Sequence, residues 1–426
     1  MKKLISAVTA GILLMCATSA TAFAVAPDPA EGLKPTADYT MDTLFSTIPP
    51  AYGDEWYIFA LARSGMDGAE DVCDTYYAAA EADFIAKNGI YTDGTGTESL
   101  AEYVRVGLVL TAMGKDITDF GGYNLLEKFT SLDFSAYTAS STSTLSYALI
   151  LTGEYADLID TSAALEQDII DEIMTRYLDN TGFTYMLGDF AAVDADTTSQ
   201  AMQGLLPYAD TSTAIADAIT NSYAYLKAQQ NTQDGAILSW GSSNPSSTAQ
   251  VMIIASQMGA DTYADFTLES GFDLLSGLLQ FRLDDGGFYE PYYGAEAGAD
   301  YFSTAQGLLG LTAFYRMESD KTPLFDFSDV VFESDDSTPD TSDNTTSEPD
   351  PETSSEPTTE SSTESTSPID SDTSDTSGDS TVDSDDASAS DTSAPVTGST
   401  SPLPFVLISA ALVLAAARIT LTKRAD

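Results

Sequence analysis

The chain has 426 residues, with 66 acidic side chains, 16 basic ones and no histidine, and its formal net charge is −50. So acidic a chain repels phosphate backbones, which excludes nucleic acid as a partner. Only one of the two cysteines, Cys73, lies beyond the first 24 residues, so we expect no internal disulfide.

Residues 1–24 have the pattern of a secretory signal peptide. Two lysines at positions 2–3 precede an apolar core over residues 4–15, and Ala-Phe-Ala at 22–24 offers a small-residue cleavage site. We therefore expect export of the chain and cleavage after Ala24.

Residues 25–332 contain an apolar motif that recurs at roughly fifty-residue spacing. Each copy opens with small hydroxyl-bearing or acidic residues and continues into an apolar stretch. A period of this size is typical of one supersecondary unit used repeatedly, here six times. The equivalent positions in the six copies are Trp56, Arg105, Ser146, Gln200, Gln250 and Gln306.

Two kinds of helix are predicted to alternate within this region. The motif stretches, such as 58–62 and 251–255, are apolar on nearly every side, which predicts helices buried all round. The segments between them are amphipathic at helical spacing, which predicts outer helices. We therefore expect an all-α fold, an α/α toroid of about six helical hairpins. The predicted outer helices include residues 69–87, 164–178, 213–229 and 264–281.

Two segments resemble the Gln–Gly–Trp repeat of squalene cyclases. Residues 226–230 are followed by Asp234-Gly235 and Trp240, and residues 278–281 are followed by Asp285-Gly286-Gly287 and Phe288. Over about residues 40–330, the chain thus resembles the terpenoid cyclase and protein prenyltransferase toroid superfamily, in the divergent form found on secreted bacterial proteins. The resemblance implies that Trp240 and Phe288 pack beside the outer helices.

The chemistries of this superfamily match the chain poorly. Prenyltransferases hold zinc through aspartate, cysteine and histidine, and this chain has no histidine. The acid motif Asp-x-Asp-Asp of squalene-type cyclases is matched by residues 194–197, with Asp196 as the acid and Thr197 in place of the last aspartate. A competing interpretation is that Asp196 or Thr197 caps a buried helix. We therefore expect a non-catalytic branch without metal or cofactor. The alternative is a terpenoid-cyclase-like or glycan-active enzyme with Asp196 as general acid.

The starts of the buried helices and the connection over residues 288–302 form the predicted ligand site. That connection is rich in tyrosine, acidic residues and glycine, and tyrosines can stack on sugar rings or hold a cation. A competing interpretation is that the tyrosines seal the end of the barrel. We expect a binding or adhesion module for a small molecule or glycan. The candidate ligand-binding residues are Trp56, Arg105, Gln200, Gln250, Gln306, Tyr289, Tyr292, Tyr293 and Tyr301.

The C-terminal part predicts a stalk and an anchor. Residues 333–400 carry 19 acidic side chains and no basic one, with much serine, threonine and proline, which predicts a disordered stalk. Residues 401–426 predict a transmembrane anchor over 403–421 with a basic tail, if Arg418 reaches the interface.

A short motif within the stalk bears on how the chain is attached. Ala-Pro-Val-Thr-Gly at 394–398 resembles a Gram-positive sorting signal, with Ala394 in place of leucine. The resemblance implies that a sortase cleaves between Thr397 and Gly398 and joins the chain to peptidoglycan. A plain membrane anchor is the alternative. Either way, we expect the protein on the extracellular face of the cell envelope.

Overall fold

A computed structural model describes residues 29–189 and 191–332 of the chain. The predicted signal peptide with Ala24, the stalk with Thr397 and Gly398, and the anchor lie outside these residues. None of the helices in the described part has the length and hydropathy needed to span a membrane.

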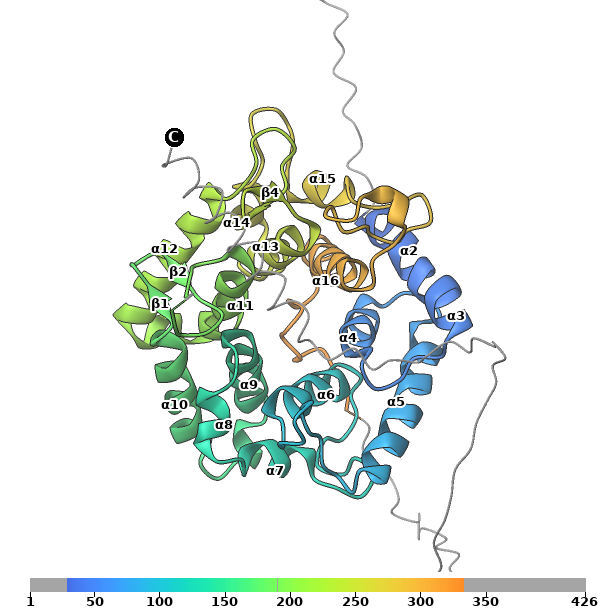
Figure 1. Cartoon of the computed structure of the whole chain (residues 1–426), viewed down its shortest axis with the longest axis vertical. Helices are drawn as coiled ribbons and strands as arrows, with labels where there is room; N and C mark the ends of the chain where they lie inside the picture. The colour runs from blue at the N-terminus through green and yellow to red at the C-terminus, as the bar shows by residue number, and fades with distance from the viewer. Residues whose placement is uncertain (1–28, 190, 333–426) are drawn as a thin grey trace, which may run out of the picture. The chain divides into compact units, whose positions relative to one another are not determined.

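Six helices form an inner ring in the described part of the chain (Figure 1). Each packs against the next in sequence, and the sixth packs against the first, so the ring is closed. The described residues are mostly helical, which confirms the all-α prediction. The inner helices are α4 (Glu55–Ser64), α6 (Leu100–Ala112), α9 (Thr142–Glu154), α11 (Ala195–Leu205), α13 (Pro245–Gln257) and α16 (Tyr301–Glu318).

A second layer of helices covers the ring from outside (Figure 1). Each of the first five inner helices is followed along the chain by its outer partner, as the sequence predicts. The outer elements are α5 (Ala69–Ala86), α7 (Leu125–Thr130), α8 (Phe134–Thr138), η2 (Ala156–Leu158), α10 (Ser162–Met174), η3 (Leu206–Thr211), α12 (Thr213–Ala228), α14 (Ala260–Ala264) and α15 (Leu274–Leu279).

The sixth pair joins the two ends of the domain. Helix α2 (Pro29–Asp38), which precedes η1 (Tyr39–Leu44) and α3 (Phe45–Thr47), packs against α16. The Arg282 guanidinium donates to the Gly32 carbonyl at 2.6 Å and ties α2 to the preceding repeat. The last inner helix therefore takes its outer partner from the N-terminal end, which the repeat pattern did not predict.

The predicted outer helix over residues 264–281 is wrong in extent. The chain leaves the helical conformation after α14 and resumes it only at α15. Gly271 has a φ of +88°, and the side chains of Asp273 and Ser276 form a capping box that starts α15. The local turn residues therefore outweigh the apolar periodicity that predicted one continuous helix.

Two small antiparallel hairpins precede inner helices. Strand β1 (Tyr177–Leu178) pairs with β2 (Gly182–Phe183) before α11, and β3 (Leu238–Ser239) pairs with β4 (Ser242–Ser243) before α13. A short 3₁₀ turn, η4 (Ala295–Ala297), lies in the connection before α16. All three connections reach the N-terminal ends of inner helices. These ends, with the residues that cap them, are called the mouth below.

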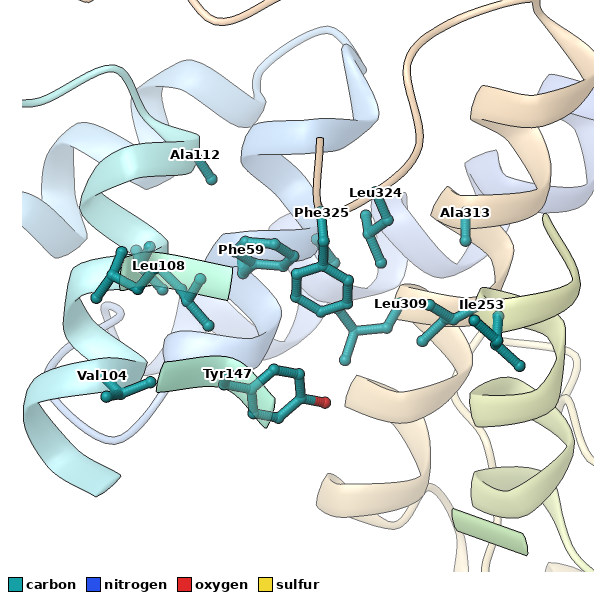
Figure 2. Close-up of a cluster of buried hydrophobic side chains, with 14 of the residues drawn as sticks. Phe59, Val104, Leu108, Ala112, Tyr147, Ile253, Leu309, Ala313, Leu324 and Phe325 are labelled. Carbon is teal, nitrogen blue, oxygen red and sulfur yellow. The ribbon is translucent and has the colours of Figure 1, made fainter. Parts of the chain in front are cut away.

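The centre of the ring is filled by the segment that follows α16, residues 319–332. This C-terminal segment runs across the ring (Figure 1) and places Leu324 and Phe325 among inner-helix side chains (Figure 2). The Phe325 ring stacks on Phe59, with centroids 5.0 Å apart, and lies 5.4 Å from the Tyr147 ring. Both Leu324 and Phe325 are buried. The ring therefore has a packed hub in place of an open channel.

Two buried arginines hold the C-terminal segment in place. Arg63 of α4 donates to the carbonyls of Leu324 and Asp326, at 3.2 and 2.6 Å. Arg63 and Arg316 of α16 both pair with Asp329, at 2.8 and 2.6 Å. Burial opposes ionisation of this carboxyl, but hydrogen bonds from the two guanidinium groups lower the pKa of Asp329 to about 2. The clamp joins the first and last inner helices through the segment that lies between them.

Candidate functional site

The mouth is organised by side chains that cap the inner helices. Asp194 accepts the Thr197 N–H at 2.8 Å, and the equivalent residues before α13 and α16 do the same. Each cap satisfies a backbone donor that the first helical turn leaves unpaired. The cap of α11 is therefore Asp194, and the interpretation that Asp196 or Thr197 caps this helix is wrong.

A second repeated contact explains the threonine in the three most similar motif copies. Its hydroxyl accepts a backbone N–H from a buried residue of the connection before the helix. This bond docks the connection onto the inner helix. The three pairs are Thr198 with Phe183 (3.0 Å), Thr248 with Ile237 (2.9 Å) and Thr304 with Phe288 (2.9 Å).

These contacts change the alignment of the two squalene-cyclase-like segments. Phe288 is buried, but its structural equivalent is Ile237. Trp240, predicted to pack beside an outer helix, lies in the turn between β3 and β4 with 70% of its surface exposed. Gln230 ties the end of α12 to the loop that follows it, since its amide donates to the Gly235 and Phe266 carbonyls at 3.1 and 2.7 Å.

Side-chain amides link neighbouring inner helices at the mouth. Gln250 donates to the Gln306 amide oxygen at 2.6 Å and accepts from Gln203 at 3.0 Å. Gln200 accepts a short hydrogen bond from the Ser143 hydroxyl. The structure therefore brings Gln200, Gln250 and Gln306 to one level, as predicted from the repeat.

Tyr147 is a residue of this site that sequence reasoning missed. Burial raises the pKa of its hydroxyl, and hydrogen bonds with Gln200 and Gln250 partly offset that rise. Ser146, the predicted equivalent position, instead donates to the Thr142 carbonyl at 2.8 Å and is buried. A one-residue shift of the repeat alignment in this copy would have found Tyr147.

Trp56 and Arg105 both lie near the mouth, but Trp56 has a partly exposed ring and Arg105 is held in ion pairs. The Trp56 ring is half-buried, with its centroid 5.0 Å from that of Tyr147, and so borders the amide level. Arg105 donates from Nε to the buried Glu55 carboxylate at 2.6 Å and also pairs with Glu102. The charge of Arg105 is thus balanced within the protein, which leaves it poorly placed to attract an anionic ligand.

Three carboxyl groups meet beside the amides. Burial, followed by the Asp196 charge, raises the pKa of Asp194 to about 7. Burial and Glu290 raise the pKa of Asp196, while a hydrogen bond with Ser247 opposes the rise. In the described residues, Oδ1 of Asp196 is buried without a hydrogen-bond partner. Glu290 accepts from the Ser303 hydroxyl at 3.2 Å. This corner of the mouth can hold a proton on a carboxyl group.

The four predicted tyrosines divide into three environments. Tyr292 and Tyr293 are 69% and 59% exposed, with their rings in edge contact at 5.1 Å. Tyr301 is about half exposed and bonds Asp54 through its hydroxyl. Tyr289 packs against Phe281 at 5.7 Å and is a wall residue. Only Tyr292 and Tyr293 are thus largely open to a ligand.

Two surface depressions lie at the opposite end of the ring. One, of about 240 Å³, borders Arg63, Arg316 and Asp329, and the other, of about 360 Å³, borders Ser256 and Lys321. The first is part of the clamp on the C-terminal segment. Neither borders the predicted ligand-binding residues.

Comparisons with known proteins give fold-level likenesses only. No family model and no curated protein matches the sequence. A polysaccharide lyase is similar over 68% of this chain and 98% of its own, at 11% identity and a TM-score of 0.49. A type II terpene cyclase from Scytonema, solved with geranylgeranyl dihydroxybenzoate, is similar over 68% of this chain and 98% of its own, at 10% identity and a TM-score of 0.47. A protein from Actinoplanes is similar over 67% of this chain and 98% of its own, at 12% identity and a TM-score of 0.42. Likenesses at these values transfer neither an activity nor a substrate to this chain.

Proposed function

We propose that this protein is a non-enzymatic binding module that holds a small molecule or glycan at the mouth of its helical ring. The observation that carries the proposal is the filled hub. Leu324 and Phe325 occupy the centre beneath the mouth (Figure 2), so a ligand would rest on the rim instead of entering a chamber.

The side chains at the mouth favour a ligand rich in hydroxyl or amide groups. Gln200, whose side chain is partly exposed, offers an amide at the ring level where the buried Gln250 and Gln306 bond each other. The half-buried Trp56 supplies an aromatic face beside them. Because Arg105 is already paired with Glu55 and Glu102, anionic ligands gain little there.

The two tryptophans of the chain allow a direct test. Only Trp56 borders the amides, so the full chain carrying Trp240→Phe has one fluorescent reporter at the mouth. We expect glucose, galactose, mannose or N-acetylglucosamine to change the Trp56 emission. Gln200→Ala should weaken this binding about tenfold, the equivalent of about 1.4 kcal/mol for lost amide hydrogen bonds.

Gln233→Ala is the matched control, because Gln233 is exposed and lies in a turn away from the amide level. It should leave the saccharide response unchanged. A Trp56 emission that ignores all four sugars would refute the mouth as their site. Equal losses in Gln200→Ala and Gln233→Ala would refute the role of the amides.

A second candidate function rests on Asp196. Its Oδ1 is buried without a hydrogen-bond partner in the described part of the chain, and its pKa is raised, and both are properties of a general acid. Under this alternative, the mouth cleaves a glycan, and Asp196→Asn abolishes reducing-sugar release while saccharide binding at Trp56 persists. A wild-type chain that releases no sugar from glucan, chitin, mannan or xylan would exclude the alternative for these polymers. A terpenoid-cyclase-like reaction is less favoured, because Phe325 fills the hub.

We propose that the module acts on the extracellular face of the cell envelope. The support comes from the sequence: the signal peptide ending at Ala24, the acidic stalk over 333–400, and the apolar segment over 403–421. The sorting-like motif adds a sortase and peptidoglycan as partners, with processing between Thr397 and Gly398.

A further inference from the structure

Three consecutive repeats carry an insertion at the same structural position. In each, the buried residue held by an inner-helix threonine is followed by a loop that ends at the helix cap. Each loop is pinched at its base by a backbone pairing. The described parts of the loops are residues 184–189 and 191–193 before α11, 238–243 before α13 and 289–299 before α16.

The three insertions are neighbours in the ring, because α11 packs on α13 and α13 packs on α16. Each presents apolar side chains to solvent. In the described connections before α4, α6 and α9, by contrast, no aromatic side chain is exposed. The insertions and the first turn of α16 are called the aromatic arc below. Its exposed side chains include Tyr185, Leu187, Trp240, Tyr292, Tyr293 and Tyr301.

Trp240 occupies an unfavourable backbone conformation. Its φ is +51° and that of Gly241 is +89°, the pattern of a two-residue hairpin turn that favours asparagine or glycine at its first position. A bulky side chain is strained there, because its Cβ crowds the following carbonyl oxygen. With 70% of its surface exposed, the indole gains little packing to offset that strain. A strained aromatic residue displayed at a hairpin tip indicates a contact outside the folded chain.

We propose that the aromatic arc binds an uncharged, β-linked polysaccharide chain of glucose-type sugars, with Trp240 as the central stacking residue. Such sugars hold their hydroxyl groups equatorially and leave flat C–H faces, which pack on aromatic rings. Exposed aromatic side chains on three separate loops fit a chain of several sugars better than a single sugar. The site lies outward of the proposed ligand site at the mouth and deepens that proposal by naming the polymer.

The polar residues of the arc favour a glycan over a protein partner. Ser239 and Ser242 flank the Trp240–Gly241 turn, and Glu290 and Glu296 lie beside the exposed tyrosines. Serine and glutamate are depleted in the cores of protein interfaces, whereas both can bond sugar hydroxyls. The acidic character of the whole chain disfavours anionic polymers.

The closing experiment uses Trp240 as its own reporter. In the full chain carrying Trp56→Phe, all tryptophan emission comes from Trp240. Titration with cellohexaose and with chitohexaose should shift this emission to shorter wavelength and protect it from acrylamide quenching. By calorimetry on the full chain, Trp240→Ala should bind the better of the two oligosaccharides about tenfold more weakly.

Two further variants separate stacking from general damage. Tyr292→Ala with Tyr293→Ala should also weaken binding, because both rings belong to the arc. Leu158→Ala should not, since Leu158 is a similarly exposed apolar residue in η2, at the opposite end of the ring. An unchanged Trp240 emission with both oligosaccharides overturns the proposal. The proposal is also overturned if a protein ligand shifts the Trp240 emission while neither oligosaccharide does.

The two proposals fail separately. If Trp240 responds to the oligosaccharides and Trp56 responds to no sugar, the arc stands and the inner site falls. If Trp56 responds to monosaccharides and Trp240 is silent with both hexaoses, the arc falls and the inner site stands.

Discussion

At the start of α11, two carboxyl groups two positions apart have different surroundings. Asp194 accepts the Thr197 N–H at 2.8 Å, while Asp196 keeps one buried oxygen without a partner in the described residues. Burial, followed by the Asp196 charge, raises the pKa of Asp194, whereas burial and the Glu290 charge raise the pKa of Asp196, so both carboxyl groups hold a proton more tightly than exposed aspartates do. The pair is therefore the most strongly perturbed acidic group at the mouth.

The pKa of Asp194, raised from 3.8 to about 7, predicts a pH dependence of stability. The folded state binds the Asp194 proton more tightly than the unfolded state does. Proton binding therefore stabilises the folded state fully below about pH 4, and this stabilisation is lost as the pH rises towards 7. The free energy of unfolding should fall by up to about 1.4 kcal/mol per pH unit in this range. Urea denaturation at pH 4, 5, 6 and 7 measures it.

Asp194→Asn isolates this effect, because asparagine keeps the capping oxygen and does not titrate. Its stability should fall less steeply with pH than that of the wild type. Asp217→Asn, an exposed change on α12, should keep the wild-type slope. Parallel curves for the wild type and Asp194→Asn would contradict the assignment.

Three of the six inner helices, α11, α13 and α16, share one way of holding the connections that lead into them. Thr198, Thr248 and Thr304 each accept a buried backbone N–H that would otherwise be unpaired. The contact also determines where an insertion can emerge, namely between the docked residue and the helix cap. Ligand-facing loops can therefore vary while the helices keep their positions.

Thr304→Val should destabilise the protein by about 1–3 kcal/mol, because the Phe288 N–H is left buried without its acceptor. Thr312→Val is a matched control on the same helix, since its buried hydroxyl has no hydrogen-bond partner in the described residues. That change should be neutral or stabilising. Free energies of unfolding in urea test both, and equal losses would show that the docking bond contributes nothing.

The C-terminal segment stabilises the ring from within. Phe325→Ala should cost about 3–5 kcal/mol, because it leaves a cavity between Phe59 and Tyr147 that rigid helices cannot close. Phe332→Ala, at the partly exposed end of the same segment, should cost less than about 1 kcal/mol. Thermal and urea unfolding compare them. Similar losses from the two changes would mean that the hub is not packed around Phe325.

At the scale of the whole molecule, the ring is closed by both ends of the domain. Helix α2 supplies the outer partner of α16, and the clamp of Arg63 and Arg316 on Asp329 joins α4 to α16. The segment held by this clamp leads directly into the acidic residues from 333 onward. If those residues form a stalk, tension on it would be applied at the clamp.

Attachment to the envelope is a separate prediction. If a sortase processes the chain, Thr397→Ala should move the protein from the cell-wall fraction to the membrane fraction. Thr400→Ala, outside the pentapeptide, should leave the distribution unchanged. Immunoblots of fractionated cells measure it. Continued wall attachment of Thr397→Ala would rule out cleavage at this motif.

Much of the candidate site could be anticipated from the repeat. Aligning the motif copies placed Gln200, Gln250 and Gln306 at one level, and the structure joins the latter two by a hydrogen bond. Tyr147 was missed because the third motif copy was aligned one residue out of register. Trp240 was misplaced because it was matched to Phe288 as another aromatic residue, whereas the structural equivalent of Phe288 is Ile237. The first error is corrected by aligning the helix caps Ser141 and Asp194, and the second by the backbone N–H groups that Thr248 and Thr304 accept, and these contacts are seen only in the structure.

The alternation of inner and outer helices was determined by the sequence alone, because burial periodicity is a local property that each repeat displays on its own. Only the tertiary structure decided that α2 closes the ring, that Phe325 fills its hub and that one oxygen of Asp196 has no hydrogen-bond partner among the described residues. Each of these depends on contacts between segments far apart in the chain, and no short-range pattern encodes the partner.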